Sequence, residues 1–120
     1  MTFSLCVHET REDGTGTPRE WFGVAVTTRL PGVGTTCPYV NTHAAISTQS
    51  LSNPDLGQLG IEYVAAGLSI GDALQSLLNA DPGRESRQVH GVDATESFTF
   101  TGESCKPWAG HLSGPNYTVA

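Results

Sequence analysis

The chain has 120 residues and a net charge of −6, with six Lys and Arg against twelve Asp and Glu, and its length is typical of one domain or part of one. A nucleic-acid partner is not expected, because phosphate neutralisation requires clustered basic side chains and Lys106 is the only lysine. The first residues lack the apolar run of a secretion signal, and no segment has the length and hydrophobicity of a membrane span. Three widely spaced cysteines do not indicate a disulfide framework. We therefore expect a cytoplasmic, acidic protein whose partner is a small molecule.

The N-terminal part of the chain predicts strands separated by loops. Phe3, Leu5 and Val7 alternate with polar residues, and this period of two is typical of a strand. Glycine and proline are concentrated in residues 9–20 and 29–38, so we expect loops there, the first of them a long hairpin loop. Small residues in the third strand suggest the close approach of another backbone or of a ligand. The expected strands cover residues 3–8, 21–28 and 43–49.

A first helix is expected to begin after Asn53 and to end at Gly67. Asn53 is a good N-cap, and Pro54 suits the first helical position. Gly57 and Gly60 lower the helix propensity of this segment, so we expect another element to pack closely against them.

A second helix begins at a capping box formed by Ser69 and Asp72. Its apolar residues are three and four apart, the spacing of a helix that faces a core. They are Ile70, Ala73, Leu74, Leu77 and Leu78.

The order of these elements indicates an α+β fold. Helices grouped between strands favour a mostly antiparallel sheet with helices on one face. The chain ends within an apolar strand pattern, so we expect residues 1–120 to form a single domain that is incomplete at its C-terminus, or a homo-oligomer in which another copy completes an open edge. The remaining expected elements are strands over 87–93, over 97–101 and from Tyr117, with a turn over 79–85 and a loop over 102–116.

Five stretches together resemble a known family. They are "MTFS", "GVAVTTR", "ISTQSLSNPDLGQLGIEYVAAGLSIGDAL", "LLNADPGRESRQVHGVD" and "FTGESCKPWAGH". In this order and spacing they resemble the bacterial and archaeal family called domain of unknown function 1028, of which this chain corresponds to the N-terminal part. That family resembles the N-terminal-nucleophile hydrolases in fold. The resemblance implies an αββα sandwich of two antiparallel sheets, with the second helix layer missing from this sequence.

The resemblance also implies a set of site residues. In N-terminal-nucleophile enzymes a Thr, Ser or Cys freed as the first residue attacks a carbonyl, and its own α-amine takes the proton. A free α-amine has a pKa of about 7.7–8.0, so it is partly neutral near neutral pH. Thr2, after removal of Met1, would be the nucleophile, and Arg29 the basic group near the amine. Gln49 and Ser47 would supply donors to the developing oxyanion. The implied activity is hydrolysis of an unidentified small amide or peptide-like bond, without a cofactor.

Other interpretations of the same residues stay open. Thr2 is also a good β-former at the start of a strand, and Asn53 is an N-cap first and a ligand contact second. His111 and Trp108 are candidates for ligand contacts, or else for a packed loop. His8 and His90 have no partner that the sequence reveals. The chain would then be a non-catalytic ligand-binding or oligomeric structural member of the family.

Two further patterns have both a functional and a structural interpretation. Cys37 and His43 have the same spacing as Cys105 and His111, and the four could form a zinc site, whereas Cys37 alone is explained as a small buried apolar residue. The segment "DPGRE" could bind an anion through arginines. Its simpler interpretation is a turn in which Arg84 pairs with a neighbouring carboxylate.

Overall fold

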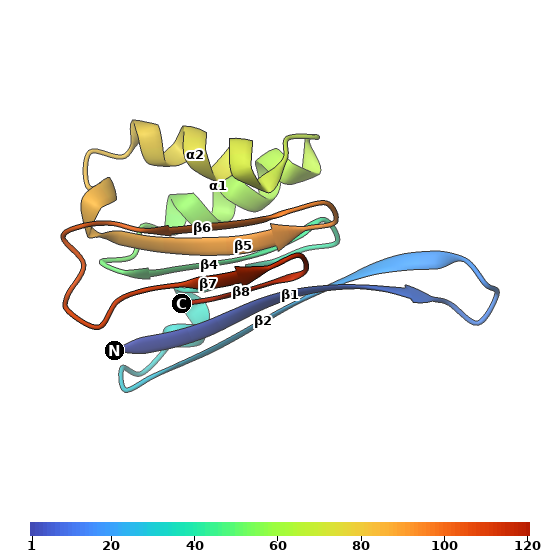
Figure 1. Ribbon diagram of the computed structural model, residues 1–120, viewed down its shortest axis with the longest axis horizontal. Helices are drawn as coiled ribbons and strands as arrows, with labels where there is room; N and C mark the ends of the chain where they lie inside the picture. Colours follow the sequence, from blue (N-terminus) through green and yellow to red (C-terminus); the bar gives the residue numbers. More distant parts are fainter.

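Two four-stranded antiparallel sheets pack face to face, and two helices cover the outer face of one of them (Figure 1). The computed structural model describes residues 1–120. Sheet A has the order β2-β1-β8-β7, with β1 (Thr2–Glu12), β2 (Pro18–Thr28), β7 (Leu112–Gly114) and β8 (Tyr117–Val119). Sheet B has the order β3-β4-β5-β6, with β3 (Pro38–Val40), β4 (Ala44–Ser50), β5 (Arg87–Asp93) and β6 (Ser97–Thr101). The helices are α1 (Pro54–Ala65) and α2 (Ile70–Ala80), and two 3₁₀ turns cover Val33–Thr35 and Arg84–Ser86. The α+β prediction is confirmed. Neither helix is long and apolar enough to cross a bilayer.

The helices begin where the capping residues predict. The side chain of Asn53 accepts a hydrogen bond from the backbone N–H of Asp55, and the Ser69 hydroxyl accepts one from Asp72. Gly57 faces the ring of Tyr39 so closely that an added Cβ would overlap it, which confirms the expected close packing. The main core lies between the helices and sheet B and consists of Ala44, Ile46, Leu56, Val64, Ile70, Ala73, Leu74, Leu78 and Val89.

Strands β1 and β2 are longer than the sequence predicts. Pairing continues to Glu12 opposite Pro18, so most of residues 9–20 is a protruding two-stranded ribbon and only the tip is a turn (Figure 1). Asp13 organises this tip, because its carboxylate accepts bonds from the backbone N–H groups of Thr15 and Thr17 and from the Arg19 side chain. Strands β3 and β7 have three residues each, too few for an alternating pattern to reveal them.

The polar face of β1 is the buried one. Ser4 and Cys6 are fully buried between the sheets, whereas Phe3 is 56% exposed. Val119, which pairs with Leu5, and Tyr117, which pairs with Val7, share this outward side, so apolar side chains gather on the outer face of sheet A. No helix covers that face (Figure 1). On β2, by contrast, Phe22 and Val24 turn inward onto the small cluster that Cys6, Ala45 and Val92 form between the sheets.

Candidate functional site

Thr2 and Gln49, which lie on different sheets, line one cavity of about 260 Å³. Thr2 is the first residue of β1, and Gln49 is the next-to-last residue of β4. Hydroxyl groups predominate around this cavity, and no charged side chain lines it. The hydroxyl-bearing residues are Thr2, Thr28, Thr35, Thr36, Ser50 and Ser52.

The hydroxyl of Thr2 is held by Thr28, its cross-strand partner. Thr2 Oγ1 donates to Thr28 Oγ1 at 3.2 Å. Thr28 Oγ1 in turn donates to the carbonyl oxygen of Met1 at 2.9 Å. Arg29 follows Thr28 directly, but it does not line the cavity, so the structure does not bring the expected basic group to this site.

A chain of hydrogen bonds between the sheets fixes the amide of Gln49. Gln88 Nε2 donates to the carbonyl oxygen of Gly110 at 3.0 Å, and a carbonyl can only accept. The Gln88 oxygen therefore faces Gln49 and accepts from its Nε2 at 2.8 Å. The Gln49 oxygen then accepts from the Ser4 hydroxyl at 2.6 Å.

The same chain of hydrogen bonds determines the tautomer of His90. Since Ser4 gives its only proton to Gln49, His90 Nε2 must donate to Ser4 Oγ, which lies 2.6 Å away. His90 Nδ1 then accepts from the Thr118 hydroxyl at 2.8 Å. Burial, with a smaller contribution from the charge of His111, lowers the pKa of His90 to about 4, so the ring is neutral at pH 7. His90, on sheet B, thus has both of its partners on sheet A, although neither is near it in sequence.

Ser47 is buried on β4, and its hydroxyl has no hydrogen-bond partner. It does not line the cavity beside Thr2, so the structure does not place this expected donor at the site. An unpartnered buried hydroxyl usually costs stability.

Asn53 does not line the cavity and belongs instead to a cluster around the ion pair of Asp81 and Arg87. Its side-chain nitrogen donates to Asp81 Oδ2 at 3.1 Å, and Arg87 Nε donates to the same oxygen at 2.9 Å. The hydrogen bond from Arg87, supported by Asn53, holds the pKa of Asp81 at about 2 against the opposing effect of burial. Both polar ends of the Asn53 amide are therefore occupied, the oxygen as the N-cap of α1 and the nitrogen by Asp81.

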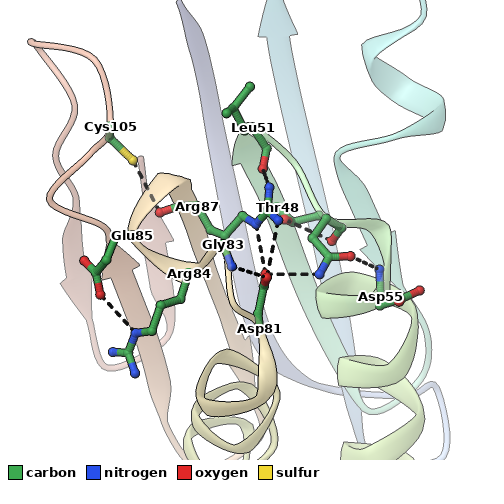
Figure 2. Close-up of polar contacts among 10 residues, drawn as sticks. Thr48, Leu51, Asp55, Asp81, Gly83, Arg84, Glu85, Arg87 and Cys105 are labelled. Atoms are coloured by element: carbon green, nitrogen blue, oxygen red, sulfur yellow. Dashed lines mark hydrogen bonds and ion pairs between the residues drawn. The ribbon is translucent and has the colours of Figure 1, made fainter.

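Arg87 also connects this cluster to Leu51, which lies between the cavity residues Ser50 and Ser52 in the sequence (Figure 2). Its Nη1 donates to the carbonyl oxygen of Leu51 at 2.6 Å. Leu51 follows Ser50, a cavity residue with a φ of 71°, which is a left-handed conformation that is uncommon for a residue other than glycine. Arg84, by contrast, pairs with Glu85 at 3.1 Å as the turn interpretation predicts.

The residues of the C-terminal loop do not reach this cavity. Trp108 is 94% exposed, so it neither packs in a core nor lines the site. His111 Nδ1 lies 2.8 Å from the Thr101 hydroxyl. The possible zinc set is not assembled, because no three His, Cys, Asp or Glu side chains are arranged around a common point. Cys37 lines the Thr2 cavity, whereas His43 lines a separate one of about 350 Å³.

Residues 2–120 match the model of the family described as "Family of unknown function (DUF1028)". The chain belongs to the DUF1028 family. A comparison with curated proteins finds no match. Among solved structures, the DUF1028 chain is similar to protein SPO2555 from Silicibacter pomeroyi, which was itself described with the same family model, at a TM-score of 0.83 and 19% identity. The alignment covers 98% of this chain and 50% of that one, so the DUF1028 chain spans half the length of this related structure.

Sequence reasoning missed two residues of this DUF1028 site. Thr28 occurs in "GVAVTTR", but its contact with Thr2 depends on the register of a strand pair. His90 looks like an ordinary strand residue, and its partner Ser4 lies 86 positions earlier. Gln88, His90 and Val92 alternate along β5 and therefore lie on one face of this strand, which is buried on both sides. The polar pair Gln88 and His90 on a buried face was a useful indication.

Proposed function

We propose that this DUF1028 chain carries the nucleophile of an amide hydrolase of the N-terminal-nucleophile type. Thr2, released from Met1, attacks the carbonyl carbon of the substrate, and its α-amine takes the hydroxyl proton. The observation that carries the proposal is the position of Thr2, whose side chain stands at the start of a strand and lines the cavity that also contains Gln49.

The arrangement of layers supports an αββα sandwich for the complete fold. Two antiparallel sheets pack face to face, and helices cover sheet B alone (Figure 1). The outer face of sheet A carries exposed apolar side chains such as Phe3, Trp21 and Tyr117. A second helix layer on that face would bury them, and the related structure is twice as long as the segment that matches.

Gln49 is the candidate oxyanion donor. Its Nε2 carries two protons, of which one goes to Gln88 and the other makes no hydrogen bond within the chain. Because both of its neighbours in the hydrogen-bond chain are fixed, this amide is held in place before substrate binds, as electrostatic catalysis requires. Ser47 and Arg29 have no part in this proposal.

The lining also suggests the kind of substrate. Hydroxyl groups and the apolar side chains of Leu30, Pro31 and Val33 surround the cavity, and no charged side chain is available to pair with an ionic substrate. A neutral amide with a small acyl group therefore fits the cavity better than an acidic or basic one.

The test uses protein of full natural length and a neutral alkyl β-lactone, which acylates nucleophilic hydroxyls. Intact mass should show that Met1 is absent, and the lactone should add once, at Thr2. Thr2→Ala should remove the adduct, whereas Thr27→Ala, one position from Thr28 on the outward side of β2, should not. Complete retention of Met1, or an adduct that persists in Thr2→Ala, would show that Thr2 is not the nucleophile.

A second candidate function is ligand binding without catalysis. The observation that favours it is that Arg29, the expected basic group, does not line the cavity. Retained Met1 together with saturable binding of a small neutral ligand would support this function.

A further inference from the structure

Thr28 is placed to handle the hydroxyl proton of Thr2. The two residues are directly opposite each other in the β1–β2 pair, and Thr28 Oγ1 is the atom to which Thr2 Oγ1 donates, at 3.2 Å. Thr28 also lines the cavity. Thr2 Oγ1 makes no other hydrogen bond within the chain.

The direction of both hydrogen bonds follows from the Met1 carbonyl. A carbonyl oxygen only accepts, so Thr28 Oγ1 must donate its single proton to the carbonyl oxygen of Met1, at 2.9 Å. The Thr28 oxygen is then free to accept the proton of Thr2. The order of donation therefore runs from Thr2 through Thr28 to the group at the N-terminal side of Thr2.

Removal of Met1 changes only the last acceptor in this series. The carbonyl leaves, and the Thr2 nitrogen becomes a free amine. Peptide geometry places that nitrogen about 2.3 Å from the former position of the carbonyl oxygen. Its lone pair is then a new acceptor on the side toward which Thr28 donates. No ionisable side chain competes for this role. Cys37 is the only one in the lining, and burial raises the pKa of its thiol, which makes it a poor acid–base group near neutral pH.

We propose that Thr28 is a catalytic residue that carries the hydroxyl proton of Thr2 to the α-amine of the same residue. This inference rests on the proposed function of Thr2. As Thr2 Oγ1 forms its bond to the substrate carbonyl carbon, its proton passes to Thr28 Oγ1, and the Thr28 proton passes to the neutral α-amine. The resulting ammonium gives a proton to the leaving nitrogen as the C–N bond breaks. Thr28 ends the step with one proton, as it began, and Thr2 holds the acyl group as an ester.

The experiment compares acylation rates by the neutral alkyl β-lactone in full-length protein from which Met1 has been removed. With this probe the ring oxygen takes the proton instead of a nitrogen. Thr28→Val removes the hydroxyl and keeps the shape, Thr28→Ser keeps the hydroxyl, and Thr27→Val is the control on the outward side of β2. Circular dichroism checks folding, and periodate, which cleaves a free N-terminal Thr, checks that each variant exposes the same amine and hydroxyl. Thr28→Ala serves as the second variant without a hydroxyl, in case Thr28→Val does not fold.

The shuttle predicts that Thr28→Val slows acylation by about 100-fold, the lower end of the effect of general acid–base catalysis. Thr28→Ser should remain within about threefold of the unmodified protein by the same reasoning, and Thr27→Val should be unchanged. In mixtures of H₂O and D₂O, the acylation rate should vary with the D₂O fraction as expected for two protons in transit in the unmodified protein. In Thr28→Val it should vary as expected for one proton.

Two results would overturn the inference in distinguishable ways. Equal rates in Thr28→Val and the unmodified protein, with Thr2 acylated in both, would reject the shuttle and leave the nucleophile in place. A periodate-sensitive, Met1-free protein that the lactone does not acylate would reject the proposed function itself, and the shuttle with it.

Discussion

Acidification should destabilise this fold through His90. The imidazole is fully buried between the sheets, and it acts as a donor to Ser4 and as an acceptor from Thr118. A second proton on Nδ1 would meet the Thr118 hydroxyl proton and would place a charge where water cannot reach it. The pKa of His90 in the folded protein is accordingly lowered to about 4.

The size of the effect follows from proton linkage. In the unfolded chain the His pKa returns to about 6.5, so between pH 6.5 and pH 4 the unfolded state binds a proton that the folded state does not. Stability therefore falls as the pH is lowered through this window. A pKa difference of about 2.5 corresponds to about 3 kcal/mol of unfolding free energy. The unfolding free energy of a domain is typically about 5–15 kcal/mol, so this effect is on the order of half of the lower value.

The assay is urea unfolding at pH 7.5 and pH 4, in the unmodified protein and in His90→Gln. Glutamine retains a donor and an acceptor but does not titrate. Between pH 7.5 and pH 4, the unfolding free energy of this variant should therefore fall by about 3 kcal/mol less than that of the unmodified protein. Asp81 does not interfere, because its pKa of about 2 in the folded state and about 3.8 in the unfolded state place its own contribution below this window. An equal loss in both proteins would refute the argument that a neutral His90 is required for the fold.

Three other substitutions test the packing and the polar clusters, each by urea unfolding at pH 7.5. Asp81→Asn leaves the largely buried Arg87 without its charged partner and should lower the unfolding free energy by about 3 kcal/mol; an unchanged midpoint would contradict the role given to this ion pair. Gly57→Ala should destabilise the protein despite a gain in helix propensity of about 1 kcal/mol, because the new methyl group overlaps the ring of Tyr39, and a stabilised variant would show that the ring moves aside freely. Ser47→Ala should be neutral or stabilise the fold by about 1 kcal/mol, since it removes a buried hydroxyl without a partner, whereas a clear loss of stability would reveal a partner for that hydroxyl.

Local patterns predicted the helices well. The N-caps Asn53 and Ser69 and the left-handed Gly67 that follows α1 are all determined by residues within one turn of the helix end. The close approach to Gly57 could also be anticipated, since a glycine costs helix stability and needs a compensating contact. These predictions depend on no residue far away in the sequence.

The site was less predictable because it depends on pairing between distant strands. Thr2 could be identified only through the family resemblance, and its contact with Thr28 depends on the β1–β2 register. His90 gains its partners from β1 and β8, which no pattern within β5 reveals. The ribbon over residues 9–20 was wrongly predicted as a loop because its polar composition hides strand pairing that the Asp13 turn makes possible.

The buried polar residues also determine which way Thr2 faces. A shift of one residue in β1 would turn Phe3, Leu5 and Val7 inward and Thr2 outward, away from the cavity. On hydrophobicity alone that register would be favourable. It would, however, take Ser4 away from Gln49 and His90, and each buried group that lost its partner would cost about 1–3 kcal/mol. The polar chain between the sheets therefore selects the register in which the Thr2 hydroxyl reaches Thr28 and the cavity.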